Sequence, residues 1–182
     1  MLQRTRAASV VPVYESMVEA YPTPKVLADA GLERVTTLIY PLGLKWRAKL
    51  IHELAISLSA RNDIPSDYDE LKSLPGVGEY VASAWMSLHA DKRAILIDAN
   101  IVRWLCRMFG QARNGETRRE PWVKEIAGLL TPRRSFKRYN YAALDFTMNV
   151  CGVRPNCEDC MLARHCTHGK GMTAQTLSKK AH

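Results

Sequence analysis

Four of the five cysteines in this chain fall within sixteen residues near its end. They follow the pattern C-x5-C-x2-C-x5-C and are Cys151, Cys157, Cys160 and Cys166. Thiols that lie so close along a chain either pair as disulfides or bind a metal centre. No signal-peptide pattern opens the sequence, no apolar run could span a bilayer, and Cys106 would be left without a partner. We therefore expect a cytosolic chain whose end folds around a metal.

The cysteine spacing bears on the identity of that metal. Structural zinc usually takes its cysteines in two tight pairs that a longer loop separates. Here one tight pair, Cys157 and Cys160, has a single cysteine on each side. This arrangement suits a [4Fe–4S] cluster, which needs four thiolates. The spacing alone leaves iron–sulfur and zinc at about even odds.

Length and charge narrow the class of protein. With 182 residues, of which 47% are hydrophobic, the chain can form one ordinary globular unit or two small lobes. The net charge of +8 favours an anionic partner. A solvated basic surface without any such partner would give the same charge, so charge alone does not decide.

The apolar pattern is helical nearly throughout, and no stretch sustains the alternation of a half-buried strand. The chain is therefore predicted to be all-α. We expect Pro12 to divide the first helical segment in two, and Thr23-Pro24 to begin a short helix that Gly31 ends. The further helices are predicted at residues 44–59, 66–73, 80–88, 99–109, 122–130 and 135–150.

A glycine-rich turn, LPGVG, covers Leu74 to Gly78 between two of these helices. Its proline stops the first helix, and Gly76 and Gly78 permit backbone conformations that are closed to residues with a Cβ. Backbone amides at the start of the second helix could hold a phosphate oxygen. The pattern is that of a helix-hairpin-helix, although a simple corner between two helices would look similar.

Asp98 stands where the apolar run AILI meets the helix predicted from Ala99. Taken alone, this aspartate is a helix N-cap, because its carboxylate accepts backbone amide hydrogens and complements the helix dipole.

Three motifs in order change this interpretation: LPGVGEYVASAW, LIDANIVRWLCR, and YNYAALDFTMNVC followed by the cysteine loop. Together they resemble the helix-hairpin-helix (HhH-GPD) DNA glycosylases that carry an iron–sulfur loop. This superfamily includes endonuclease III, the MutY-type adenine glycosylases and the G·T-mismatch thymine glycosylases. The opening MLQRTRAASVVPVY is also similar to the family, so the resemblance extends to about Cys166.

The resemblance implies a two-lobed, all-α fold. Residues 1–103 would form a helical barrel lobe with the hairpin, and residues 104–168 an iron–sulfur lobe whose four cysteines hold a [4Fe–4S] cluster. We expect residues 169–182 to be a disordered tail. The implied partner is double-stranded DNA with a mismatched or damaged base, bound by a monomer in the cytoplasm, at the nucleoid and away from membranes.

The resemblance also assigns roles to residues. Asp98 matches the catalytic aspartate, whose carboxylate stabilises positive charge on the sugar or activates water. Tyr80 stands where bifunctional members have a Schiff-base lysine, so we expect a monofunctional enzyme that releases the base without cutting the strand. The residues expected to contact DNA are Gln3, Arg4, Leu74, Gly76, Val77 and Gly78. The motifs favour adenine opposite G or 8-oxoguanine slightly over thymine opposite G.

Two departures from the family pattern qualify these roles. The first cysteine gap has five residues where the family usually has six. Relatives also carry a few dozen residues before the MLQ segment, including a glutamate that protonates the departing base in adenine enzymes. We expect a chain that starts at Met1 to be N-terminally truncated and to lack this acid. The alternatives are thus a catalytically impaired DNA-binding protein and, from another class, a zinc-stabilised interaction domain.

Overall fold

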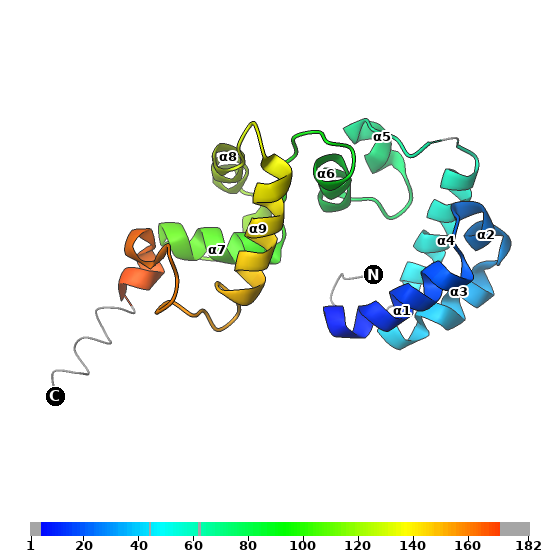
Figure 1. The fold of residues 1–182 in the computed structure, drawn as a ribbon, viewed down its shortest axis with the longest axis horizontal. Helices are drawn as coiled ribbons and strands as arrows, with labels where there is room; N and C mark the ends of the chain where they lie inside the picture. The colour runs from blue at the N-terminus through cyan, green and yellow to red at the C-terminus, as the bar shows by residue number, and fades with distance from the viewer. Residues whose placement is uncertain (1–4, 44, 62, 172–182) are drawn as a thin grey trace. The chain divides into compact units, whose positions relative to one another are not determined.

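The structure, a computed structural model, describes residues 5–43, 45–61 and 63–171 (Figure 1). Those residues form helices and connecting segments without a strand, so the all-α prediction is confirmed. Contacts divide the chain into one unit, Met1–Ala82, and a second, Ser83–His182, each described by itself below. This division falls inside a helix, and the family's predicted lobe boundary after residue 103 stays a prediction.

The first unit is built from short helices packed around one apolar core. The elements are α1 (Ala7–Ala20), α2 (Pro24–Asp29), α3 (Leu32–Ile39), a 3₁₀ helix (Tyr40–Leu42), α4 (Trp46–Ser59) and α5 (Tyr68–Ser73). The core residues are Val10, Val13, Val35, Ile39, Leu42 and Ala48. They come from α1, α3, the 3₁₀ helix and α4, so the apolar faces of these elements meet in one cluster.

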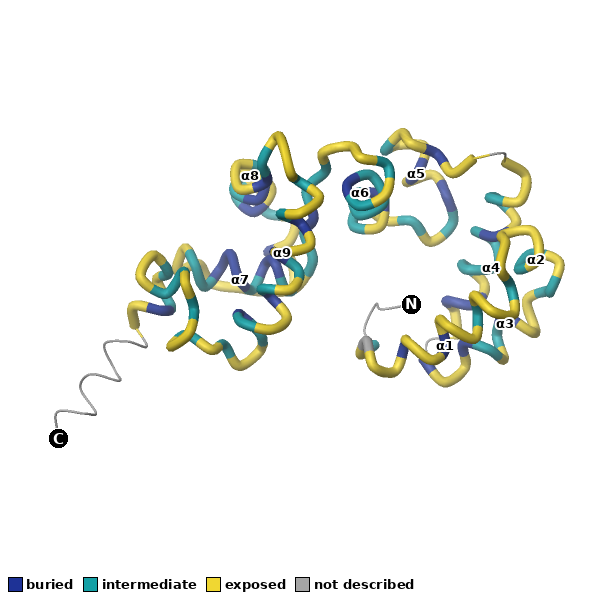
Figure 2. Tube along the Cα trace, viewed as in Figure 1, coloured by how far each residue is buried: buried dark blue, intermediate teal, exposed yellow. Residues whose placement is uncertain are grey.

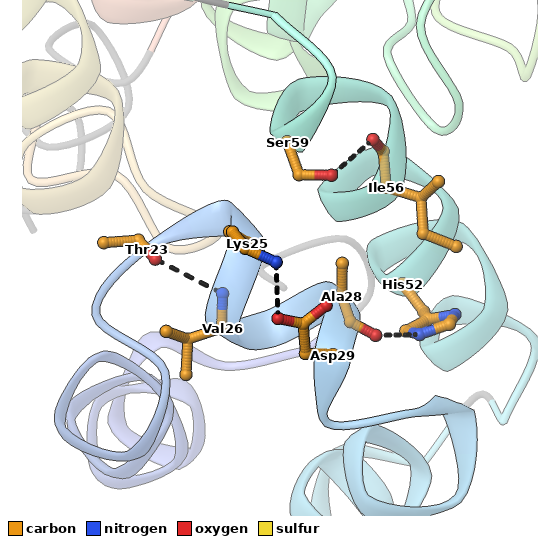
Figure 3. Close-up of polar contacts among 8 residues, drawn as sticks. All are labelled: Thr23, Lys25, Val26, Ala28, Asp29, His52, Ile56 and Ser59. Atoms are coloured by element: carbon orange, nitrogen blue, oxygen red, sulfur yellow. Dashed lines mark hydrogen bonds and ion pairs between the residues drawn. The ribbon is translucent and has the colours of Figure 1, made fainter.

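The short helix α2 has an N-cap and packs against α4 (Figure 3). Thr23 is the N-cap of α2, and its hydroxyl accepts the Val26 amide at 3.3 Å. Ring atom Nε2 of His52 on α4 lies 3.0 Å from the carbonyl oxygen of Ala28, a hydrogen bond that joins the two helices. Gly31 follows α2 with a φ of 80°, as its predicted role at the helix end requires.

The prediction that Pro12 divides the first segment was wrong, since α1 runs unbroken from Ala7 to Ala20 with Pro12 inside it. Pro12 lies in the first turns of the helix, where it removes a single backbone hydrogen bond. Most residues around Pro12 are exposed. Water can therefore donate a hydrogen bond to the backbone carbonyl that would otherwise accept the missing N–H of the proline. Val10 and Val13 flank the proline and anchor this part of α1 in the core.

The second unit holds the later helices. They are α6 (Glu79–Leu88, which begins in the first unit), α7 (Ala99–Phe109), a 3₁₀ helix (Thr117–Arg119), α8 (Pro121–Leu130), α9 (Phe136–Asn149) and a second 3₁₀ helix (Ala163–His165). The predicted helices agree with these bounds to within two residues. The most buried stretch of α7, dark blue in Figure 2, packs with residues of α8 and α9 in one core.

Polar contacts to α8 and α9 hold the extended segment between α6 and α7. The Asn140 amide on α9, only 2% exposed, donates to the Ser87 hydroxyl at 2.6 Å and to the Ala94 carbonyl at 3.0 Å. Arg93 donates to the carbonyls of Gly128 and Thr131 at the end of α8, at 2.7 and 2.6 Å. These bonds hold the backbone that leads to Asp98.

Residues 167–171 are helical, so the predicted disordered tail does not begin at 169; residues 172–182 lie outside the described residues. Among the helices that the structure describes, none has both the length and the apolar character needed to cross a membrane.

Candidate functional site

Asp98 is the N-cap of α7, as its sequence position predicted. Oxygen Oδ1 accepts the backbone amides of Asn100 at 2.9 Å and Ile101 at 2.7 Å. Oxygen Oδ2 accepts the side-chain amide of Asn100 at 3.1 Å. Three N–H donors therefore hold both oxygens of a half-buried carboxylate, and such a carboxylate has a defined direction.

Behind Asp98, a series of hydrogen bonds leads to the cysteine loop. Arg103 donates to the Asn100 side-chain oxygen at 2.8 Å. The same guanidinium donates to the carbonyls of Thr147 at 2.7 Å and Cys151 at 3.0 Å. Asp98, Asn100, Arg103 and the first cysteine are thus linked without a break. Sequence reasoning missed Asn100 and Arg103, although their three-residue spacing places them on one face of α7.

Neighbouring groups act on the pKa of the Arg103 guanidinium in both directions. Burial lowers the pKa of its guanidinium, and the neighbouring cations Arg107 and Arg113 lower it further. Cys151 and Asp98 act in the opposite direction. All three arginines line an open cavity of about 600 Å³ beside the end of α7, and carboxylates are absent from the residues that line it.

The predicted DNA contacts in the hairpin turn between α5 and α6 differ in burial and in their hydrogen bonds. The Leu74 side chain is buried, and its carbonyl accepts the Val77 amide at 3.1 Å, so both residues stabilise the turn itself. Gly76 and Gly78 are exposed, and their amides have no hydrogen-bond acceptor among the described residues. Gly76 has a φ of 73°, and a Cβ there would lie 3.2 Å from the Cβ of Leu50.

Tyr80 lies half-buried in the first turn of α6, two residues after Gly78. It belongs with the hairpin to the first unit, whereas Asp98 belongs to the second. The predicted roles of Tyr80 and Asp98 in one reaction therefore stay predictions. Gln3 and Arg4, the other predicted DNA contacts, lie outside the described residues.

The four clustered cysteines are free thiols that line one narrow cavity. Burial raises the pKa of the Cys157 thiol, and the charges of Cys160, Cys166 and Cys151 raise it further, in that order. The four sulfur atoms are thus close enough to influence one another. Cys106 is buried in the core on α7, as expected of a small apolar residue.

Arginine and backbone contacts hold the first part of the cysteine loop. Arg107 donates to the Gly152 carbonyl at 2.6 Å and to the Val153 carbonyl at 3.0 Å, and its Nη1 lies 3.5 Å from the sulfur of Cys151. The Asn156 amide donates to the Val150 carbonyl at 3.0 Å and closes the loop. The five-residue gap therefore forms a closed loop with its backbone hydrogen-bonded.

The fit of this cavity to a metal centre can be tested on its donor atoms. No set of three or more His, Cys, Asp or Glu side chains in the described ranges is placed to hold one metal ion. Four-coordinate zinc needs such a set, because all its ligands bind one ion. A [4Fe–4S] cluster instead takes one thiolate at each iron, so its cysteines stand further apart. The four cysteines that line the cavity match the number of thiolates a cluster needs, and the cluster itself stays a prediction.

A residue that lines this cavity has a buried nitrogen without a hydrogen-bond partner. Trp104 lines the cysteine cavity and is 9% exposed, yet its indole N–H has no acceptor among the described residues. Leaving such a donor unsatisfied costs about 1–3 kcal/mol. An acceptor within hydrogen-bond reach of this N–H would remove that cost.

Comparisons with known proteins identify the family of the chain. The HhH-GPD superfamily of base excision DNA repair proteins matches residues 1–125. The chain is 38% identical to a thymine/uracil-DNA glycosylase of Pyrobaculum aerophilum, over 91% of this chain and 75% of that protein. It is 36% identical to a thymine-DNA glycosylase of Aeropyrum pernix, over 92% and 78%. An adenine DNA glycosylase of Mycolicibacterium smegmatis is 31% identical, over 99% and 62%.

Solved structures are similar over nearly the whole chain. A thermostable thymine-DNA glycosylase superimposes with a TM-score of 0.84 at 28% identity, covering 93% of this chain and 80% of that one. Endonuclease III in a trapped covalent intermediate with DNA gives 0.81 at 26% identity, covering 94% and 81%. The order of the motifs, the helical fold and these similarities lead to one conclusion: the chain belongs to the HhH-GPD superfamily of base excision DNA repair proteins.

Proposed function

We propose that this chain is a monofunctional DNA glycosylase that hydrolyses the N-glycosidic bond of a mispaired base. The observation that carries the proposal is the geometry of Asp98, whose two carboxylate oxygens are held by three N–H donors. Breaking an N-glycosidic bond builds positive charge on the sugar. A carboxylate held in one direction can stabilise that charge, or activate water, without first reorganising.

Tyr80 supports release of the base without strand cleavage. A Schiff base with the sugar needs an amine, and a phenol cannot form one. Replacing Tyr80→Lys tests this role, because it supplies the missing amine at the first turn of α6. We expect borohydride to trap a covalent complex between this variant and DNA, and to trap little or none with the wild type. Efficient trapping by the wild-type protein would contradict the monofunctional assignment.

The hairpin supplies the grip on DNA. The exposed amides of Gly76 and Gly78 lie at the start of α6, where the helix dipole favours an anion. A phosphate of the DNA backbone matches these donors and needs no particular base sequence. The net charge of +8 adds a long-range attraction that weakens with salt.

We further propose thymine or uracil opposite guanine as the base removed. The motifs of the sequence favour adenine slightly, but relatives named for thymine or uracil are 38% and 36% identical and the adenine enzyme 31%. Tyr80 is compatible with either base. The target must be flipped out of the stack, at a cost of a few kcal/mol that is smallest for a mispaired base. The wobble pairs G·T and G·U meet that condition.

The same proposal includes a [4Fe–4S] cluster as the group that the four cysteines hold. Its support is the shared cavity of the four thiols, the position of Arg107 near Cys151 and the orphaned indole of Trp104. Bound there, the cluster would crosslink four positions of the loop of residues 151–166 to one another. Iron and sulfide analysis of the protein purified without oxygen tests this part, and stoichiometric zinc with little iron would contradict it.

The deciding experiment for the activity is single-turnover base release from duplexes carrying G·T, G·U, A·G or A·8-oxoguanine. Alkali added after the reaction converts abasic sites to strand breaks. We expect release from G·T and G·U. Release from the adenine pairs alone would confirm a glycosylase and overturn the proposed base. Tight duplex binding with release from none of the four would instead indicate a DNA-binding protein without catalysis.

A further inference from the structure

Trp104 occupies an unusual position on α7. The residue before it, Arg103, bonds the carbonyl of Cys151, and Arg107 one turn later lies beside the sulfur of Cys151. The Cys166 thiol also donates to the Arg107 carbonyl at 3.4 Å. This part of α7 thus forms a wall of the cysteine cavity, and Trp104 is the tryptophan among the residues that line it.

The indole N–H of Trp104 has no hydrogen-bond acceptor among the described residues. The indole nitrogen can only donate a hydrogen bond, so a neighbouring donor group cannot act as its partner. Trp122 shows the ordinary arrangement in the same unit, because its indole donates to the Glu120 carboxylate at 2.6 Å. Trp104 is more than nine-tenths buried, so bulk water does not replace the missing partner.

We propose that the indole N–H of Trp104 donates a hydrogen bond to a sulfur atom of the iron–sulfur cluster. This inference rests on the cluster proposed above and concerns a role for a residue outside the four ligands. Hydrogen bonds to cluster sulfur withdraw negative charge and thereby favour the more reduced state. Trp104 therefore raises the reduction potential of the cluster and protects it from oxidation.

The aromatic neighbourhood offers a competing explanation. Trp104 and Phe146 meet edge to face, with ring centroids 5.6 Å apart and planes at 70°. An indole N–H directed at the ring of Phe146 would be a weak hydrogen bond of its own. In that case the nitrogen would not affect the reduction potential of the cluster. The two explanations therefore make different predictions for that potential in a Trp104 variant.

The test compares Trp104→Phe with the matched control Trp122→Phe, both purified with their cluster and without DNA. Each variant loses one indole N–H and keeps an aromatic ring, but only the first loses the orphaned donor. We expect Trp104→Phe to have a lower reduction potential than the wild type and to lose its visible absorption about threefold to tenfold faster under ferricyanide. Trp122→Phe should match the wild type in both measurements.

A measurement on the wild-type protein guards against a Trp104 variant that does not fold. The protein is labelled with indole-¹⁵N tryptophan, and the paramagnetic form of its cluster is studied by electron spin echo spectroscopy. We expect a coupling between one indole ¹⁵N and the cluster spin. Absence of this coupling would overturn the inference, as would identical potentials and bleaching rates in wild type and Trp104→Phe. Wild-type protein that contains no iron would overturn both the cluster and this inference.

Discussion

In the part of the chain that the structure describes, two aspartates cap helices, one in each unit, and they differ in their surroundings. Asp67 begins α5, where its Oδ1 accepts the amides of Asp69 and Glu70 at 3.0 Å each. Asp98 begins α7 with the same pattern at 2.9 and 2.7 Å. Asp67 is exposed on a short helix, whereas Asp98 is half-buried. Its second oxygen bonds Asn100, which leads through Arg103 to the cysteine loop.

The comparison shows that capping and catalysis need not compete for one carboxylate. A cap needs one oxygen directed at two backbone amides. A catalytic carboxylate also needs a fixed direction, which a supporting set of hydrogen bonds provides. Both aspartates satisfy the first need, and the surroundings of Asp98 add the second.

The largest effect is expected from Asp98→Asn, with Asp67→Asn as its control. Asparagine caps helices about as well as aspartate, so both variants should fold like the wild type. Removing the charge at residue 98 should slow single-turnover base release at least ~100-fold while duplex binding persists. Base release at the wild-type rate in Asp98→Asn would exclude this residue from the chemistry.

The link behind Asp98 is tested by Arg103→Ala. This change leaves the carbonyl of Thr147 without a donor and the carbonyl of Cys151 with only the 3.4 Å contact from Arg107, so the free energy of unfolding should fall by about 2 kcal/mol. Arg113→Ala is the control, because Arg113 lines the same cavity but is exposed and makes no hydrogen bond among the described residues. Equal stability of the two variants in urea denaturation would show that the link is energetically unimportant.

A smaller effect is expected from Asn100→Ala, which removes the bond to the second oxygen of Asp98 and the bond accepted from Arg103, and keeps both backbone amides. Losing the bond to Asp98, worth about 1 kcal/mol, should slow base release roughly fivefold. Duplex affinity, measured by fluorescence anisotropy, should not change. A rate equal to that of the wild type would mean that the cap alone directs the carboxylate.

The smallest effect is expected from Asp67→Ala, which removes a cap from an exposed helix of six residues. The free energy of unfolding should fall by about 1 kcal/mol, and base release at saturating enzyme should stay at the wild-type rate. Thermal denaturation together with the single-turnover assay checks both parts. A large loss of activity in this variant would place Asp67 in the functional site and end the contrast with Asp98.

Much of the local structure could be predicted from the sequence, because helices and caps depend on residues close together in the chain. The N-caps Thr23 and Asp98 are where the sequence placed them. Pro12 was misjudged because a proline near a helix start costs a single hydrogen bond, and two core valines offset that loss. The assignment of Leu74 to DNA contact did not foresee that its side chain belongs to the core.

The sequence by itself determined the helical class, the hairpin glycines, the capping aspartate and the clustered cysteines. It could do so because periodicity, turn chemistry and spacing are local properties. Only the tertiary structure decided that Arg103 reaches Cys151, forty-eight residues later in the chain, and that Trp104 lines the cysteine cavity. Contacts between distant residues form only when helices pack, and the sequence pattern of one helix does not specify which side chains meet across the interface.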